Sequence, residues 1–188
     1  KKSLTDLSSW NISDDGVFNK SEKSFEVLFC DIEIEGREVT RWDQPLLKPK
    51  DMELIIFLMK KINGVPHFLI RLTKEYGIYD GVEIGASMHI AKSELDVIHN
   101  DEIKNYLIRK YKERTNIVNT SLLSEEGGRF YHEQNLYLII QADEDFNSIN
   151  VNNEYFWVTL GQLNYFIQSD NFVNIQARNL FTLIKLGD

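Results

Sequence analysis

Apolar and polar residues alternate along residues 25–36, FEVLFCDIEIEG, and this period of two predicts a β-strand. Two apolar runs within residues 52–74 are joined by Asn63–Gly64, a pair that readily takes positive φ at both central positions of a tight turn. We therefore predict a β-hairpin over this stretch. Residues 82–91 and 130–143 carry further apolar runs, and each is expected to form a strand.

Helical spacing is clearest in residues 100–115, which have one apolar face, acidic residues at the start and basic residues at the end. Asn100 is the expected N-cap of this helix. Residues 159–168 begin with Thr and Gln at capping-box spacing and predict a short helix. Residues 174–186 predict a last helix. Because strands lead and helices are mixed in later, the pattern favours an α+β fold over regular βαβ units.

The composition is that of a folded protein with an acidic surface. Hydrophobic residues make up 43% of the 188 residues, and there is no linker, low-complexity stretch or internal repeat, so we expect one domain over residues 1–188. The formal net charge is −8, and apart from residues 109–114 the basic residues do not cluster, which disfavours a nucleic-acid partner. Without a signal peptide or a membrane-spanning run, a cytoplasmic protein with no membrane partner is expected.

The densest group of polar chemistry lies in residues 124–135, SEEGGRFYHEQN, here called the elbow. Gly127 and Gly128 could let main-chain amides approach a phosphate, although spacing alone favours a simple turn or bulge. Arg129 could bind a diphosphate or carboxylate, and its alternative is a surface salt bridge with Glu125 or Glu126.

Other polar residues give weaker signals. If residues 130–143 form a strand throughout, His132 and Glu133 point to opposite faces, so at most one can line a given pocket. The four histidines lack metal-ligand spacing, and the single cysteine, Cys30, excludes a Cys-based site, so no metal site is expected. Trp42 and Gln44 could stack on and bind a base or sugar. Alternatively, Trp42 packs at a strand edge and Pro45 ends the strand.

Taken together, five stretches resemble the NDP-hexose 2,3-dehydratases in order and rough spacing. They are RWDQPLL (41–47), NGVPHFLIRLTKEYG (63–77), LLSEEGGRF (122–130), FWVTLGQL (156–163) and DNFVNIQARNLFTLI (170–184). The resemblance implies a Nudix-like mixed β-sheet flanked by helices. It also implies a lyase that removes water across C2 and C3 of a 4-keto-6-deoxy sugar nucleotide in deoxysugar biosynthesis. The family carries two such repeats, and this chain resembles one of them. The sequence departs from the family at GASMHIA (85–91), at YHEQNLY (131–137) and at IQAR, where Arg178 is kept without its usual acid.

The resemblance also implies a set of functional residues. Removing a proton from C3 next to a C4 ketone needs an acid–base pair and a stabilised enolate oxygen, but no redox cofactor. The candidates for acid–base catalysis are His89, Glu126, His132 and Tyr76. The candidates for substrate binding are Trp42, Gln44, Gly127, Gly128, Arg129, Asn174 and Arg178. The expected partner is a nucleotide-diphosphate sugar, with dTDP favoured.

Two alternatives to catalysis remain open at this point. One is a domain that binds an NDP-sugar without turning it over, and the other is a protein-interaction module on a Nudix-like frame. We also predict a homodimer, because a single repeat should expose the apolar face that a sister repeat covers, and NLFTLIKL (179–186) could supply part of that face.

Overall fold

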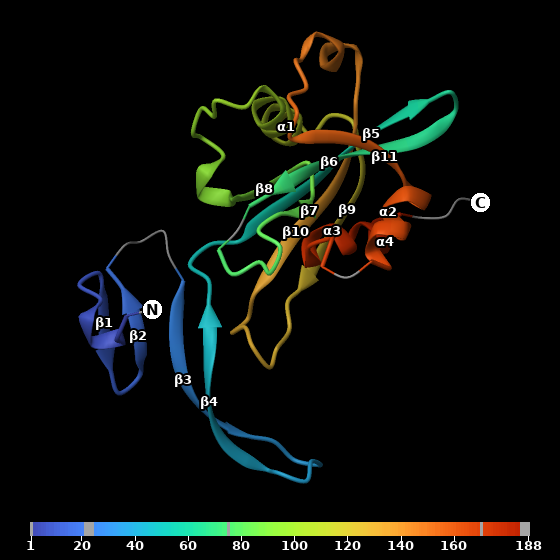
Figure 1. Ribbon diagram of the computed structural model, residues 1–188. Coiled ribbons are helices and arrows are strands. Elements are labelled where there is room, and N and C mark those ends of the chain that lie inside the picture. The colour runs from blue at the N-terminus through green and yellow to red at the C-terminus, as the bar shows by residue number, and fades with distance from the viewer. Residues whose placement is uncertain (1, 21–24, 75, 170, 185–188) are drawn as a thin grey trace. The chain divides into compact units, whose positions relative to one another are not determined.

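The computed structural model describes residues 2–20, 25–74, 76–169 and 171–184. It divides the chain into two compact units (Figure 1). Unit 1 comprises residues 1–52 and 123–135, and unit 2 comprises residues 53–122 and 136–188. Each unit is described by itself, and the expectation of a single domain stays a prediction.

The predicted hairpin forms the centre of unit 2. Strands β5 (Glu53–Ile62) and β6 (Val65–Thr73) pair in antiparallel fashion, with Ile62 opposite Val65. The turn residues Asn63 and Gly64 have φ values of 51° and 81°, as the Asn-Gly pair predicts. The hairpin prediction is therefore confirmed.

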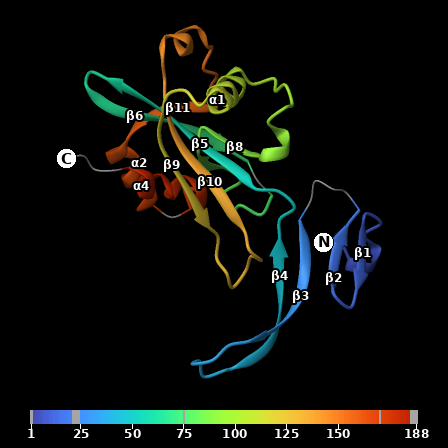
Figure 2. The ribbon, with the colours of Figure 1, turned by 180° about the vertical axis from the view of Figure 1, so that it is seen from behind.

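Further strands extend this hairpin into a mixed sheet. The order is β11-β6-β5-β10-β9, where β9 is Ile117–Ser124, β10 is Gln134–Gln141 and β11 is Tyr155–Thr159 (Figure 2). Strand β10 runs parallel to β5, and β11 runs antiparallel to β6. Strand β10 starts at Gln134, so the strand predicted over residues 130–143 is shorter than expected at both ends. The expected α+β class, with a mixed sheet and flanking helices, is confirmed.

Residues 82–91 form two short strands rather than the single predicted strand. Strand β7 (Glu83–Gly85) pairs with β6, and β8 (Met88–Ala91) pairs with β5, so this segment fills a fork between β5 and β6. Ser87 lies at the fork and is fully buried. Its hydroxyl accepts a hydrogen bond from the Leu58 amide (2.8 Å) and donates one to the Leu69 carbonyl. The hydroxyl thus supplies hydrogen-bond partners to one amide of β5 and one carbonyl of β6, at the point where these two strands diverge.

Helix α1 (Glu102–Glu113) covers one face of the sheet with Ile103, Tyr106 and Leu107 in the main apolar cluster. Its N-cap is Asp101 rather than the predicted Asn100, because the Asp101 carboxylate accepts hydrogen bonds from the amides of residues 103 and 104. The 3-10 helix η2 (Lys92–Glu94) precedes α1 in the sequence, and η3 (Glu144–Ser148) follows β10.

Three short helices lie on the opposite face of the sheet (Figure 1). They are α2 (Leu160–Ile167), α3 (Ile175–Arg178) and α4 (Leu180–Leu183). The capping box that starts α2 is confirmed. The single helix predicted over residues 174–186 is wrong, because Asn179 separates α3 from α4, and residues 185 and 186 lie outside the described residues.

Unit 1 contains a four-stranded sheet in the order β1-β2-β3-β4, preceded by the 3-10 helix η1 (Leu4–Asp6). The strands are β1 (Trp10–Ser13), β2 (Gly16–Asn19), β3 (Glu26–Glu33) and β4 (Arg41–Lys48). The predicted strand over residues 25–36 is confirmed as β3. The expectation that Pro45 ends its strand is wrong, since β4 continues to Lys48. Proline has no amide hydrogen to donate to a neighbouring strand, and it is tolerated here because β4 lies at the edge of this sheet. Phe29, which lies opposite Pro45 on β3, donates its amide hydrogen away from β4, to the Asp15 carbonyl.

Candidate functional site

The elbow connects β9 to β10 and is fastened to the edge of β4. Leu47 donates its amide hydrogen to the Arg129 carbonyl (2.8 Å) and accepts a hydrogen bond from the Tyr131 amide (2.7 Å). Inside the elbow, the Glu126 carbonyl accepts hydrogen bonds from the amides of residues 129 and 130. The elbow is thus a turn held by main-chain hydrogen bonds.

The two glycines of the elbow are not required by its own packing. A Cβ at Gly127 or Gly128 would meet nothing within 4 Å, and neither residue has positive φ. The elbow therefore has open space beside its main chain, where a ligand could approach.

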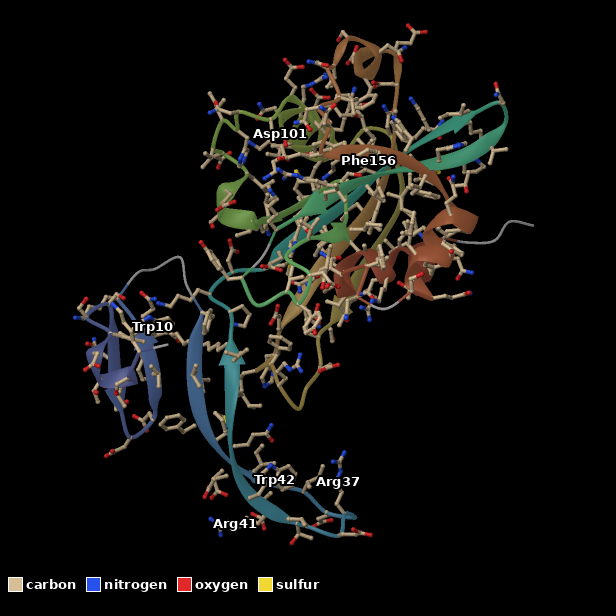
Figure 3. All side chains as sticks on the ribbon, viewed as in Figure 1. Trp10, Arg37, Arg41, Trp42, Asp101 and Phe156 are labelled. Carbon is tan, nitrogen blue, oxygen red and sulfur yellow. The ribbon has the colours of Figure 1, made fainter. Side chains whose placement is uncertain are left out.

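Several predicted binding residues meet at the elbow (Figure 3 labels Trp42 on the β3–β4 hairpin). The Trp42 indole donates to Gln44 Oε1 (3.0 Å), and Gln44 Nε2 donates to the Gly128 carbonyl. Arg129 lies 3.9 Å from Glu126, with both side chains more than half exposed, so the salt bridge named as its alternative is present. Both ends of the Gln44 side-chain amide are therefore bonded to groups of the protein itself.

A cavity of about 630 Å³, here called the elbow cavity, opens beside this turn. It is lined by Leu46, Ser124, Glu125, Gly127, Phe130, Tyr131, His132, Glu133 and Gln134. The expectation that His132 and Glu133 point to opposite faces was made for a strand and does not apply, because both residues precede β10 and His132 has a positive φ of 54°. Both of them line this cavity. The lining includes two glutamates and neither lysine nor arginine, so its charge does not favour a diphosphate.

The other predicted site residues belong to unit 2, where they do not form a single cluster. The Tyr76 side chain is fully exposed. Asn174 is buried and caps α3 by accepting a hydrogen bond from the Ala177 amide (2.8 Å). Arg178 donates to the Val173 carbonyl (2.9 Å). Asn174 and Arg178 are therefore hydrogen-bonded to main-chain groups near them in the sequence. His89, in contrast, lines a cavity.

This second cavity, here called the sheet cavity, has a volume of about 470 Å³. It is lined by Arg71, Leu72, Thr73, Lys74, Val82, Ala86, His89, Asn153 and Glu154, which come from β6, the fork segment and the start of β11. Its size falls within the usual range for small-molecule pockets. Among the lining residues themselves, Arg71 and Lys74 are basic and Glu154 is the acidic residue, so the lining favours an anionic ligand more than that of the elbow cavity does.

Arg71 is fixed at the wall of the sheet cavity by acidic neighbours. Its guanidinium donates to Glu154 (2.9 Å) and lies 3.9 Å from Asp101. Asp101, labelled in Figure 3 at the start of α1, also accepts a hydrogen bond from the Tyr155 hydroxyl (2.6 Å). Burial disfavours the charge of Arg71, but the hydrogen bond to Glu154 and the neighbouring groups raise its pKa above the ordinary value. Burial likewise raises the pKa of Tyr155.

Sequence reasoning missed Arg71, Thr73 and Lys74 as site residues, although one signal was present. Arg71 interrupts the apolar run of β6, and a charged residue inside such a strand is rarely buried without a partner or a function. Its partners Glu154 and Asp101 are far away in sequence, so spacing could not reveal them.

The described residues contain neither a metal-binding cluster nor a membrane-spanning helix. Among them, no group of three or more His, Cys, Asp or Glu side chains is arranged to hold a metal ion. No described helix is long and apolar enough to cross a membrane.

Comparisons with known proteins give a consistent family. A family model described as NDP-hexose 2,3-dehydratase matches residues 1–184. Curated relatives from Streptomyces violaceoruber and Saccharopolyspora spinosa are 30% and 33% identical over 97% and 94% of this chain. Each is named dTDP-4-dehydro-6-deoxy-alpha-D-glucopyranose 2,3-dehydratase. The chain spans only 41% and 36% of their respective lengths.

Solved structures show weaker likeness. A Nudix hydrolase from M. smegmatis, RenU, aligns with 81% of this chain and 94% of its own, at 14% identity and a TM-score of 0.42. The Ap4A hydrolase of C. elegans aligns with 61% of this chain and 84% of its own, at 12% identity and a TM-score of 0.35. Likeness at these scores carries no argument about chemistry.

Proposed function

Because this chain belongs to the NDP-hexose 2,3-dehydratase family, we propose that it acts in removing water across C2 and C3 of an NDP-4-keto-6-deoxyhexose, with dTDP as the favoured nucleotide. The observation that carries this proposal is the family match over residues 1–184. The names of the curated relatives support dTDP and the 4-keto-6-deoxy sugar. The reaction is that of a lyase.

The sheet cavity is the better place in this chain for such a substrate. Arg71 can pair with the diphosphate, and a charged hydrogen bond of this kind is stronger than a neutral one. Thr73 and Asn153 add neutral polar groups for the sugar hydroxyls. The elbow cavity would place the same diphosphate beside Glu125 and Glu133.

The reaction needs a base for the C3 proton, an acid for the departing C2 hydroxyl, and positive charge near the enolate oxygen that forms at C4. It is redox-neutral, so the proposal includes no redox cofactor. His89 lines the sheet cavity, and its imidazole is a group that can both take up and release a proton. Lys74, the second cation of the lining, can offset the enolate charge.

A non-catalytic NDP-sugar-binding role is the second proposal. It is favoured by one observation: Gln44, Asn174 and Arg178, all predicted to bind substrate, make hydrogen bonds that serve the protein scaffold. Binding and turnover therefore have to be measured separately.

The test begins with a thermal-shift screen of the 188-residue chain against dTDP, UDP, GDP and CDP. A ligand that binds only the folded state raises the Tm, and we expect the largest rise with dTDP. No rise with any nucleotide would contradict both proposals. Incubation with dTDP-4-keto-6-deoxyglucose, followed by NMR of the sugar, then separates them: loss of the C2 hydroxyl supports the dehydratase, and binding without change supports the second role.

The homodimer and the cytoplasmic location also remain proposals. One argument for the dimer is weakened, because Leu180 and Leu183 of the C-terminal stretch are buried within unit 2. Another apolar surface remains, since Phe156 and Phe172 are about half exposed (45% and 53%) beside a cavity of about 590 Å³ (Figure 3 labels Phe156 on β11). Sedimentation at micromolar concentration is expected to give twice the single-chain mass, and a mass near 22.0 kDa would refute the dimer.

A further inference from the structure

We propose that His89 is the acid–base residue of the sheet cavity and that Glu53 is the residue that positions it. This inference rests on the dehydratase function proposed above. His89 Nε2 lies 2.5 Å from Glu53 Oε2, and the two side chains are about 25% and 36% exposed. His89 lines the cavity, whereas Glu53 is not among the lining residues. His89 is thus the residue that a bound ligand can contact, and Glu53 holds it from outside the lining.

The main chain fixes the geometry of this pair. Glu53 begins β5 and pairs with Ala91, and His89 pairs with Ile55, so both side chains come from adjacent, antiparallel strands. Ile55 and Met88, next to His89 in space and in sequence, are almost fully buried. Acid–base residues act best when rigid, packed elements hold them, and this pair meets that condition.

A carboxylate on one ring nitrogen gives an imidazole two properties. It fixes the orientation and tautomer of the ring, and it stabilises the imidazolium that forms when the other nitrogen takes a proton. The hydrogen bonds of His67 and His99 go instead to the main-chain carbonyls of Val65 and Glu94. The Glu53 contact therefore distinguishes His89 from these two histidines.

The chemical step can be written with one proton shuttled by one residue. His89 takes the proton from C3, and the electrons of the C3–H bond move to give an enolate at C4, which Lys74 can stabilise. The enolate electrons then return to form the C2=C3 double bond, and the C2–O bond breaks. His89 gives its proton to the departing hydroxyl, so water leaves and His89 is neutral again. The remaining C3 enol tautomerises to the 3,4-diketo sugar.

The experiment uses the 188-residue chain with dTDP-4-keto-6-deoxyglucose in D2O. Proton NMR follows two signals: exchange of the C3 proton with solvent deuterium, and loss of water. We expect His89→Gln to lower both rates by about 100-fold or more, with the affinity for dTDP changed by less than about twofold. Glu53→Gln should lower kcat roughly 10- to 100-fold, and Glu53→Asp should recover part of that loss.

The control is His67→Gln, which removes a histidine outside the cavity and should leave both rates unchanged. A melting curve of each variant shows whether it is folded, and His89→Asn replaces His89→Gln should the latter fail to fold. If the wild-type chain neither binds nor converts the substrate, the proposed function is refuted and this inference with it. If the wild-type chain is active and folded His89 variants exchange the C3 proton at the wild-type rate, only the assignment of His89 is refuted.

Discussion

The elbow in unit 1 and the sheet cavity in unit 2 both bring polar side chains together, but different forces hold them. The elbow is fastened by main-chain hydrogen bonds to Leu47, and its ion pair between Glu126 and Arg129 is exposed. At the sheet cavity, Arg71 is largely buried and is fixed by Asp101, also largely buried, and by the exposed Glu154. A dense group of charges in the sequence is therefore a weaker guide to a binding site than one charge placed inside a buried strand.

Unit 2 contains an ion cluster around one buried lysine. Lys110, almost completely buried, lies 2.5 Å from Asp143, which also accepts hydrogen bonds from Tyr106 (2.9 Å) and Asn116 (2.7 Å). Burial works against the charge of Asp143, but these hydrogen bonds outweigh it and lower its pKa from 3.8 to about 2. We expect Asp143→Asn to lower the free energy of unfolding by about 2 kcal/mol, measured by urea titration at neutral pH.

The same measurement in acid tests the cause. Because the folded pKa of Asp143 is depressed, its contribution is present above pH ~4 and is lost as the pH falls towards ~2. The variant should therefore lose less stability than the wild type over this range. In unit 1, Asp31 makes an exposed pair with Arg41, and Asp31→Asn should leave the unfolding midpoint unchanged. Equal losses for the two variants would remove the contrast between the units.

Two glycines give the next largest contrast. A Cβ at Gly85 would lie 2.8 Å from Thr73 Cγ2 and 3.2 Å from Asn174 Nδ2, so Gly85→Ala should cost about 1–2 kcal/mol of stability. A Cβ at Gly128 meets open space, and Gly128→Ala should leave the Tm unchanged. Thermal melts of both variants check this. A drop in Tm for Gly128→Ala would show that the elbow is packed more tightly than its contacts indicate.

Two arginines give the contrast in binding. Arg71→Ala should weaken dTDP binding about tenfold, because it removes a charged hydrogen bond to the diphosphate. Arg129, which the family resemblance favours, lies in the elbow, whose cavity is lined by Glu125 and Glu133 and by no lysine or arginine, so Arg129→Ala should change the affinity by less than about twofold. Calorimetric titration of both variants decides between them. A larger loss of affinity for Arg129→Ala than for Arg71→Ala would show that the diphosphate binds at the elbow.

The elements that could be predicted from the sequence are those whose determining residues lie close together in the chain. The Asn63–Gly64 turn, the apolar face of α1 and the capping box of α2 each depend on residues close together in the chain. The fork was missed because it depends on Ser87 reaching two main-chain groups that belong to strands far away in sequence. Pro45 was misjudged for a related reason, since its effect depends on whether its strand is an edge strand.

The candidate site follows the same division. His89 could be proposed from the sequence, but Glu53 and Arg71 could not, since only the pairing of β5 with β8 and the contacts of β6 with Asp101 and Glu154 bring them into the site. His132 and Glu133 were assigned to opposite faces because the strand was extended too far towards the elbow. Periodicity describes regular elements well, and it fails where a turn replaces a strand.

The most direct test of the central claim is hydrogen–deuterium exchange of the chain with and without saturating dTDP. The account predicts that dTDP slows exchange in peptides covering residues 71–74, 82–89 and 153–154, which line the sheet cavity. Peptides covering residues 124–135 should exchange at the same rate in both samples. Protection of the elbow without protection of residues 71–74 would contradict the account.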